Sequence, residues 1–206
     1  MSAPAATTAL AVNYARHTPQ QAVHVAVPRG GITRVHLPDD DAKAHLVTAV
    51  LKARGEPDEE LELFGEHASR LSLRRRDELR ARVGAVSPIV GLVANLNTWE
   101  NISLPAAYRG APRLEEVAKL AREVIAGFGL APEKLLARLP EQLGALERKV
   151  AAFARLLVVP PELLVLDDLE DGLSYAECNC ATRFETEFRA RQPQGTVLYV
   201  DIKEDT

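Results

Sequence analysis

The chain has 206 residues, of which 47% are hydrophobic, 26% are charged and 5% are aromatic. This length and composition allow a sizeable buried core, and they exclude a disordered chain or a coiled coil. The net charge of −4 argues against nucleic-acid binding by a basic surface. No uncharged apolar run approaches the roughly 18 residues that cross a bilayer, and no basic segment followed by an apolar one opens the chain. We therefore expect a cytoplasmic protein.

The two cysteines, Cys178 and Cys180, form a lone C-x-C pair. No second pair and no nearby histidine completes a metal site around them. We expect ordinary thiols in a reducing compartment.

Strand-like and helix-like segments alternate along the chain. Residues 22–27 alternate as a strand, a Pro-Arg-Gly-Gly turn follows, and residues 32–37 form a second predicted strand. A helix is predicted next, because the acidic run 39–41 suits an N-cap and first turn, an apolar stripe covers 46–51, and Gly55 stands where a helix stops.

The second half of the chain continues this pattern. Helices are predicted over 114–128, 141–158 and about 174–191. Residues 163–166 form a fully apolar run, as expected of a strand buried on both faces of a parallel sheet, and residues 196–200 form a last buried strand. The alternation predicts an α/β fold, with a mostly parallel sheet flanked by helices.

A helical stretch lies between the two halves of this alternation. We predict a single domain over 1–206, in which 1–97 and 140–206 form the core and about 98–139 form an inserted helical subdomain.

Three stretches carry a resemblance to a known family. Residues 139–148 read LPEQLGALER, residues 161–168 read PELLVLDD, and residues 91–105 read GLVANLNTWENISLP. In order and spacing they are similar to the signature motif, the Walker B strand and the segment after the Q-loop in the nucleotide-binding subunits of ABC transporters. The likeness is nearest to importers and to the lipid-transport subfamily of the Gram-negative envelope. It implies a P-loop NTPase fold.

The phosphate-binding loop of that family departs from its usual pattern here. Such a loop reads G-x-x-x-x-G-K-S/T, because glycines let backbone N–H groups close around the phosphates, the lysine neutralises them and the hydroxyl binds Mg²⁺. The corresponding residues 37–45 read LPDDDAKAH, and only Lys43 matches. Leu37 and Ala42 replace the glycines, and Ala44 replaces the hydroxyl.

Three aspartates, Asp39, Asp40 and Asp41, stand where the triphosphate would lie. A like-charge contact at ~4 Å costs about 1 kcal/mol in water and more in a partly desolvated pocket, so we expect this loop to repel ATP. An aspartate carboxylate can instead accept the helix N-terminal N–H groups that phosphate would use. A self-capped helix and residual nucleotide binding by residues 39–44 both stay open.

The resemblance implies roles for further residues. Asp167 would hold Mg²⁺ if nucleotide binds, and Asp168 stands in place of the catalytic glutamate with a side chain one methylene shorter. The Q-loop glutamine falls near Ser87 or Pro88, and the switch histidine falls near Ile202. These replacements remove groups on which ATP hydrolysis depends in the family.

The signature motif is also altered. Gly144, Ala145 and Leu146 replace its Ser-Gly-Gly, whereas Glu147 and Arg148 are retained. Leu146 would obstruct the approach of a partner's γ-phosphate. Tyr14 lies roughly where the family places an aromatic that stacks on adenine.

Our leading hypothesis is a catalytically degenerate ABC nucleotide-binding subunit that acts as a structural or regulatory partner of a membrane transport complex, with no bound cofactor. The resemblance implies a permease subunit, a second ATPase subunit in a homo- or heterodimer, or both as partners, and attachment to the inner membrane only through the permease.

The alternative is a divergent but active ATPase subunit for envelope lipid or solute transport. In that case Lys43, Asp167 and Asp168 carry phosphate binding, Mg²⁺ binding and water activation. A third hypothesis is an α/β scaffold that binds another protein outside transport.

Overall fold

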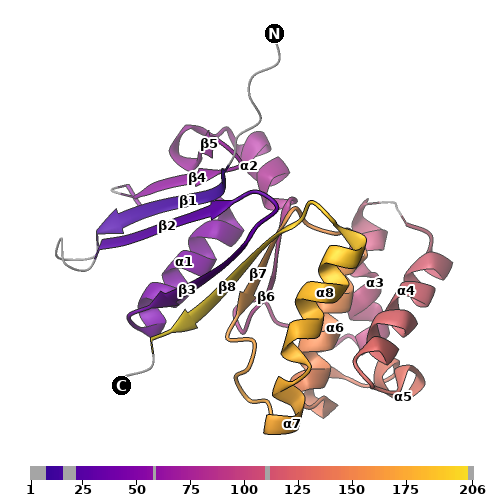
Figure 1. Cartoon of the computed structure of the whole chain (residues 1–206). Coiled ribbons are helices and arrows are strands. Elements are labelled where there is room, and N and C mark those ends of the chain that lie inside the picture. The colour runs from indigo at the N-terminus through magenta and orange to yellow at the C-terminus, as the bar shows by residue number, and fades with distance from the viewer. Residues whose placement is uncertain (1–7, 16–21, 58, 110–111, 204–206) are drawn as a thin grey trace. The chain divides into compact units, whose positions relative to one another are not determined.

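The computed structural model describes residues 8–15, 22–57, 59–109 and 112–203 (Figure 1). The chain divides into two compact units, each built from separate parts of the sequence. The first unit comprises Met1–Gly84, Glu162–Asp167 and Gln194–Thr206, and the second comprises Ala85–Pro161 and Asp168–Pro193.

The predicted parallel sheet is present, with the strand order β3-β8-β7-β6. Strand β8 pairs in parallel with β3 on one side and with β7 on the other. Every residue of β7 is buried, as the apolar run at 163–166 predicted. These features confirm the α/β fold. The strands are β3 (Ile32–Leu37), β6 (Val83–Val86), β7 (Leu163–Asp167) and β8 (Thr196–Ile202).

A second sheet of the first unit is antiparallel and has the order β2-β1-β4-β5. Only β2 was predicted from the sequence. Strand β1 pairs with β2 along one edge and with β4 along the other, so it lies inside this sheet. The strands are β1 (Thr8–Ala15), β2 (Ala22–Pro28), β4 (Glu60–Leu63) and β5 (Glu66–His67).

The helix predicted after β3 is α1 (Asp40–Lys52), which packs against β3, β4 and β8 of the same unit (Figure 1). Its predicted end at Gly55 is wrong. The helix is closed by Ala53, which adopts the left-handed conformation with φ of 47° and donates its N–H to the carbonyls of Ala49 and Val50. A short 3₁₀ turn (Ala68–Arg70) and α2 (Leu73–Arg80) complete the helical part of the first unit that the structure describes.

Apart from Ala85 and Val86 of β6, the regular secondary structure in the described part of the second unit is helical. Helix α6 packs against α3, α4 and α8 (Figure 1). Three aromatic rings join these elements: the centroid of Phe184 lies 4.5 Å from that of Phe128 and 5.0 Å from that of Phe153. The helices are α3 (Thr98–Arg109), α4 (Leu114–Gly127), α5 (Pro132–Leu136), α6 (Ala145–Leu157), α7 (Tyr175–Cys178) and α8 (Ala181–Arg191).

Two predicted helices have different bounds in the structure. The helix predicted over 141–158 is a 3₁₀ turn at Pro140–Gln142, followed by α6 from Ala145. Leu143 and Gly144 between them are extended, with ψ of 140° and 172°. The helix predicted over about 174–191 is divided into α7 and α8.

None of the helices in the described part of the chain has the length and apolar character that crossing a membrane requires. The predicted division into a core of 1–97 and 140–206 and a lobe of about 98–139 stays a prediction.

Candidate functional site

The junction between β3 and α1 corresponds to the phosphate-binding loop. Only Pro38 and Asp39 connect the last residue of the strand to the first residue of the helix. Asp39 is the N-cap, and its Oδ1 accepts the backbone N–H of Ala42 at 2.7 Å. The backbone carbonyl of Asp39 also accepts the N–H of Lys43 at 3.1 Å. The chain thus supplies its own acceptors at this helix N-terminus, as a self-capped helix requires.

Lys43 is buried between carboxylates of the first unit. Only 8% of its side chain is exposed, and its Nζ lies 3.2 Å from Oδ1 of Asp40 and 4.0 Å from Oδ1 of Asp167. Asp167 is the last residue of β7 and is 2% exposed, so it offers its carboxylate to the interior and not to solvent. The lysine and aspartate that the resemblance assigned to phosphate and Mg²⁺ are therefore brought together.

The other residues predicted at this junction have different surroundings. Ala42 is buried, whereas Asp41 and Ala44 are exposed on the first turns of α1. Tyr14 lies in β1 opposite Val23 of β2, and its side chain lies outside the described part of the structure.

Asp168 begins the segment that returns to the second unit after β7. Its φ of 46° is in the left-handed region, which is unusual for a residue other than glycine. Its backbone carbonyl accepts the N–H of Asp171 at 3.1 Å and a hydrogen bond from Nζ of Lys149 at 2.9 Å. Lys149, which sequence analysis missed, therefore helps to hold the turn that presents Asp168.

The signature segment is stabilised by its own glutamate. Glu147 accepts the backbone N–H of Gly144 at 2.8 Å, and it forms an ion pair with Arg138 at 2.7 Å. Leu146 is 5% exposed and belongs to the core of the second unit. The prediction that Leu146 would obstruct an approaching phosphate is therefore wrong, because its side chain is turned inward. The start of α6 therefore differs from that of α1: Glu147 accepts the N–H of the N-cap residue Gly144, and no side chain in the described part of the chain caps the first N–H groups of the helix.

The loop after β6 is fixed within the second unit by polar contacts. Ser87 Oγ accepts the N–H of Ile89 at 3.1 Å, and the guanidinium of Arg155 donates to the Gly91 carbonyl at 3.1 and 3.2 Å. Burial lowers the pKa of Arg155. Farther along, the buried Asn101 side chain accepts the N–H of Val93 at 2.7 Å and donates to its carbonyl at 3.1 Å.

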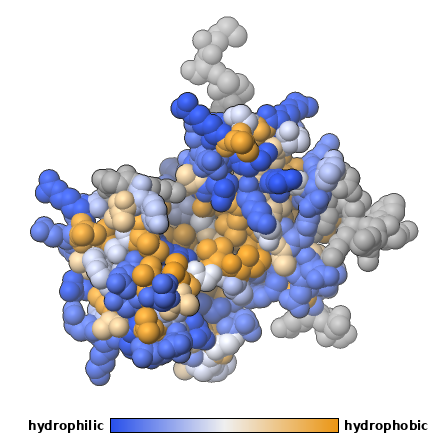
Figure 2. Space-filling view, turned by 180° about the vertical axis from the view of Figure 1, so that it is seen from behind, coloured by the Kyte–Doolittle hydropathy of each residue, from blue (hydrophilic) through white to orange (hydrophobic). Residues whose placement is uncertain are grey.

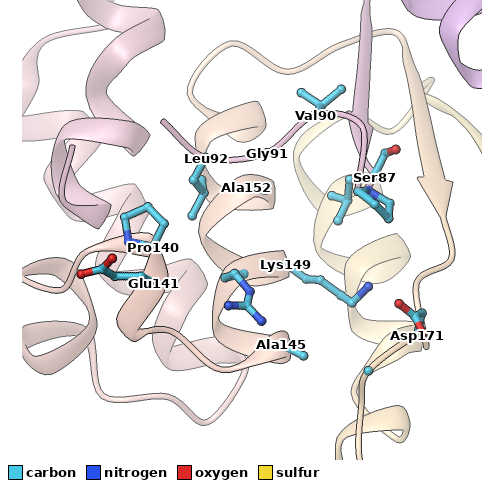
Figure 3. Close-up of a pocket in the computed structure, with 14 residues that line it drawn as sticks. Ser87, Val90, Gly91, Leu92, Pro140, Glu141, Ala145, Lys149, Ala152 and Asp171 are labelled. Carbon is cyan, nitrogen blue, oxygen red and sulfur yellow. The ribbon is translucent and has the colours of Figure 1, made fainter. Parts of the chain in front are cut away.

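A pocket of about 550 Å³ lies within the second unit (Figure 3). Its walls come from the 86–92 loop, from Pro140 and Glu141, from one face of α6, and from Asp171 and Gly172. In Figure 3, Val90 and Leu92 lie on the side opposite Lys149, and Glu141 and Asp171 lie toward opposite ends. The first two of these segments correspond to the Q-loop and signature regions of the resemblance, and the third follows the Walker B strand β7.

Comparison with known proteins decides the family. No family model matches the chain. The lipoprotein-releasing system ATP-binding protein LolD of Novosphingobium aromaticivorans is 30% identical over 155 residues, which are 75% of this chain and 68% of that protein. The chain belongs to the ATP-binding proteins of ABC transporters.

Other members of the ABC family match shorter parts. The methionine import ATP-binding protein MetN 1 of Rhodococcus jostii is 33% identical over 54% of this chain and 32% of that protein. The nickel import ATP-binding protein NikO of Rhodobacter capsulatus is 33% identical over 66% of this chain and 51% of that protein. The chain thus spans a third to a half of the length of these two relatives.

The fold is that of ABC cassettes of known structure. The cbiO1 protein of Clostridium perfringens, part of the ABC transporter complex cbiONQ, has a TM-score of 0.71 at 18% identity, with 96% of this chain and 79% of that chain covered. A dimeric bacterial ABC transporter cassette has a TM-score of 0.73 at 19% identity over 94% of this chain and 88% of that chain. These likenesses confirm the P-loop NTPase-like α/β fold.

Sequence analysis of this ABC protein missed Arg138 and Arg155, which hold the signature glutamate and the Gly91 carbonyl. Arg155 had a usable signal, because it lies on the amphipathic helix that follows the signature, eight positions after Glu147. Arg138 had none, since its partner is set by the 3₁₀ turn and not by helical spacing.

Proposed function

We propose that this chain is a catalytically degenerate ABC ATP-binding subunit that works by binding its partners and not by hydrolysing ATP. The observation that supports this most is the short connection between β3 and α1. Pro38 and Asp39 alone leave no loop whose N–H groups can surround a triphosphate, and Asp39 already accepts the N–H of Ala42.

The residues at this junction do not fit a nucleotide with Mg²⁺. Ala44 has no hydroxyl for the metal. The carboxylates of Asp40 and Asp41 are exposed, so a triphosphate bound here would lie close to two like charges. Lys43 is directed to Asp40 and Asp167, so binding phosphate would require it to exchange one anionic partner for another. Neither ATP nor Mg²⁺ is therefore proposed as a resident cofactor, and Asp168 is not assigned as a base.

The second phosphate-binding element of the family supports the same proposal. In an active dimer the signature N-terminus of one subunit faces the phosphate on the other. Here Glu147 accepts the Gly144 N–H, and no serine hydroxyl is present at that position. Because Glu147 is retained from the family's motif, the weaker phosphate binding that we propose at this helix start comes from the lost serine hydroxyl and the replaced glycines.

The proposed partners are a permease subunit and a second ATP-binding subunit, identical or different, with attachment to the inner membrane only through the permease. Apolar side chains of the second unit support a docking role, since Ile89, Val93 and Tyr108 are 47%, 42% and 85% exposed. On the face shown in Figure 2, hydrophobic patches interrupt a mainly hydrophilic surface. We propose neither nucleic acid nor direct membrane insertion.

An active ATPase subunit for envelope lipid or solute transport is the second candidate. It is favoured by the 4.0 Å separation of the Lys43 ammonium and the Asp167 carboxylate, the two retained groups of the nucleotide site. The names of the relatives also describe ATP-binding proteins, including a lipoprotein-releasing one. In this candidate a partner subunit would supply the missing groups.

Phosphate release by the purified chain distinguishes the two candidates. The proposal expects no turnover above buffer, and the same result for Lys43→Ala and for the control Lys52→Ala on the same helix. Turnover that disappears in Lys43→Ala and persists in Lys52→Ala would assign the chain to the active class. Assays in the presence of a co-purified permease and ATPase subunit extend the test to a site completed by a partner.

A further inference from the structure

One face of α6 forms the floor of the pocket in the second unit. Ala145, Arg148, Lys149 and Ala152 line the pocket, and their spacing of i, i+3, i+4 and i+7 places them on one side of the helix. The two alanines leave space that longer side chains would fill. The two cations lie between them along the helix, so the floor carries positive charge at its centre.

The opposite wall is apolar. Pro88, Val90 and Leu92 come from the loop after β6, and Figure 3 places Val90 and Leu92 across the pocket from Lys149. The volume of about 550 Å³ is within the roughly 300–1,000 Å³ that small-molecule sites occupy. An apolar wall facing a cationic floor suits a molecule with an apolar body and an anionic group.

The walls are held in place before any ligand arrives. Arg155 of α6 donates to the Gly91 carbonyl, which fixes the apolar loop to the floor helix. At the other end, Gly172 has a φ of 72°, a conformation that favours glycine, and a Cβ added there would be in ordinary van der Waals contact with Cβ of Ala145 at 3.4 Å. A preformed site loses less conformational freedom on binding than one that must close.

The charges of the pocket favour an anion at its centre. Arg148 is exposed, and within the described residues it forms no ion pair. The acidic side chains that line the pocket, Glu141 and Asp171, lie toward its two ends (Figure 3). These carboxylates repel an anion from the two ends of the pocket. At the centre, Lys149 donates to the Asp168 carbonyl, so Arg148 is the group that would bind the anion.

We propose that this pocket binds a small amphipathic anion, a carboxylate or phosphate monoester with an apolar chain, whose charge is bound by Arg148 and whose chain lies against Val90 and Leu92. All of its lining residues belong to the second unit, whereas Lys43 belongs to the first. The proposal is therefore independent of whether the chain binds ATP.

Calorimetric titration of the purified full chain with octanoate and with octyl phosphate tests this proposal. We expect at least one of them to bind, and the tighter ligand identifies the anionic group. Inorganic phosphate and 1-octanol, which carry only the charge or only the chain, should each bind at least about tenfold more weakly. Failure of both amphipathic anions to bind, or equal binding of octanol or of phosphate, would overturn the proposal.

Variants assign the binding to this pocket. Arg148→Ala should weaken binding of the anion by about tenfold or more, since it removes a charge-assisted hydrogen bond. Ala152→Leu should weaken binding because the larger side chain fills the floor of the pocket. Leu92→Ala should also weaken binding because it removes part of the apolar wall. It adds no bulk, so it serves as the second variant if Ala152→Leu lowers the melting temperature of the protein. Arg122→Ala on α4 is a control that should keep full affinity. Unchanged binding in Arg148→Ala, or loss of binding in Arg122→Ala, would contradict the assignment.

Discussion

Asp39 and Glu147 each place a carboxylate oxygen on a backbone N–H at the start of a helix. These two helix starts are the ones that the ABC family uses for phosphate, and an anion is favoured at both by the helix dipole. Lys43 completes the arrangement in the first unit, because its ammonium lies beside the carboxylates of Asp40 and Asp167. On our proposal, the carboxylates of Asp39 and Asp40 supply negative charge where a nucleotide would bring it.

The N-cap can be tested by replacing Asp39. Asp39→Ala removes the acceptor for the Ala42 N–H and should lower the free energy of unfolding by about 1 kcal/mol, measured in urea. Asp39→Ser restores a capping oxygen and should recover most of that loss. Equal stability of Asp39→Ala and the native chain would show that the cap contributes nothing.

The Arg82 and Glu162 pair predicts a pH dependence. Hydrogen bonds from Arg82, at 2.6 and 2.9 Å, hold the pKa of the Glu162 carboxyl below its ordinary value of 4.5. A carboxyl whose pKa is lowered on folding stabilises the protein above its unfolded pKa, and this contribution is lost as the pH falls through the folded pKa. Because the pair is partly exposed, we expect only about 0.5–1 kcal/mol.

The measurement compares urea unfolding of the native chain and Glu162→Gln. The difference in stability should be complete above about pH 5 and should shrink as the pH falls below the ordinary glutamate value. Glu170→Gln, an exposed change in the second unit, should give no such difference. A difference in unfolding free energy that grows as the pH falls would contradict the direction of the pKa shift.

At the scale of elements, the helices and strands that could be predicted are those whose residues form a clear apolar run or a clear helix start. The apolar run at 163–166 and the N-terminal aspartates of α1 led to β7 and to the cap. Strand β1 was missed because the alanines among its residues weaken the apolar pattern set by Leu10 and Val12, both buried. Strands β4 and β6 have four residues each, too few for a period to be recognised.

Element ends were harder to predict because they depend on single contacts. Helix α1 ends at an alanine in the left-handed conformation, where composition favours the later Gly55. Helix α6 begins late because Glu147 accepts the Gly144 N–H and holds that residue as a cap. The pocket was not predicted at all, since its walls come from segments that are distant in sequence.

The aromatic cluster of α6 gives a prediction at this scale. Phe153 is fully buried and contacts the rings of Phe128 and Phe184. Phe153→Ala should lower the free energy of unfolding by about 3–5 kcal/mol, because it leaves a cavity among packed rings. Phe153→Leu keeps more of the volume and should cost clearly less. A loss below about 1 kcal/mol in the alanine variant would mean that the surroundings collapse to fill the site.

At the scale of the whole molecule, the fold matches that of ABC cassettes, whereas the residues of the phosphate-loop motif do not match the family's pattern. The fold matches an ABC cassette with a TM-score of 0.73 at 19% identity, and the sequence relation to LolD covers 75% of the chain. Within this fold, the connection between β3 and α1 lacks the length and the glycines of a phosphate loop. The framework is therefore kept, and on our proposal it is kept for binding partners.

Thermal unfolding of the purified chain in the presence of Mg²⁺ and ATP tests this account most directly. A ligand that binds only the folded state must raise the melting temperature by mass action. We predict no change up to millimolar ATP, and identical curves for Lys43→Ala and Lys52→Ala. A melting temperature that rises with ATP in the native chain and in Lys52→Ala, but not in Lys43→Ala, would contradict the account and show that the first unit still binds nucleotide.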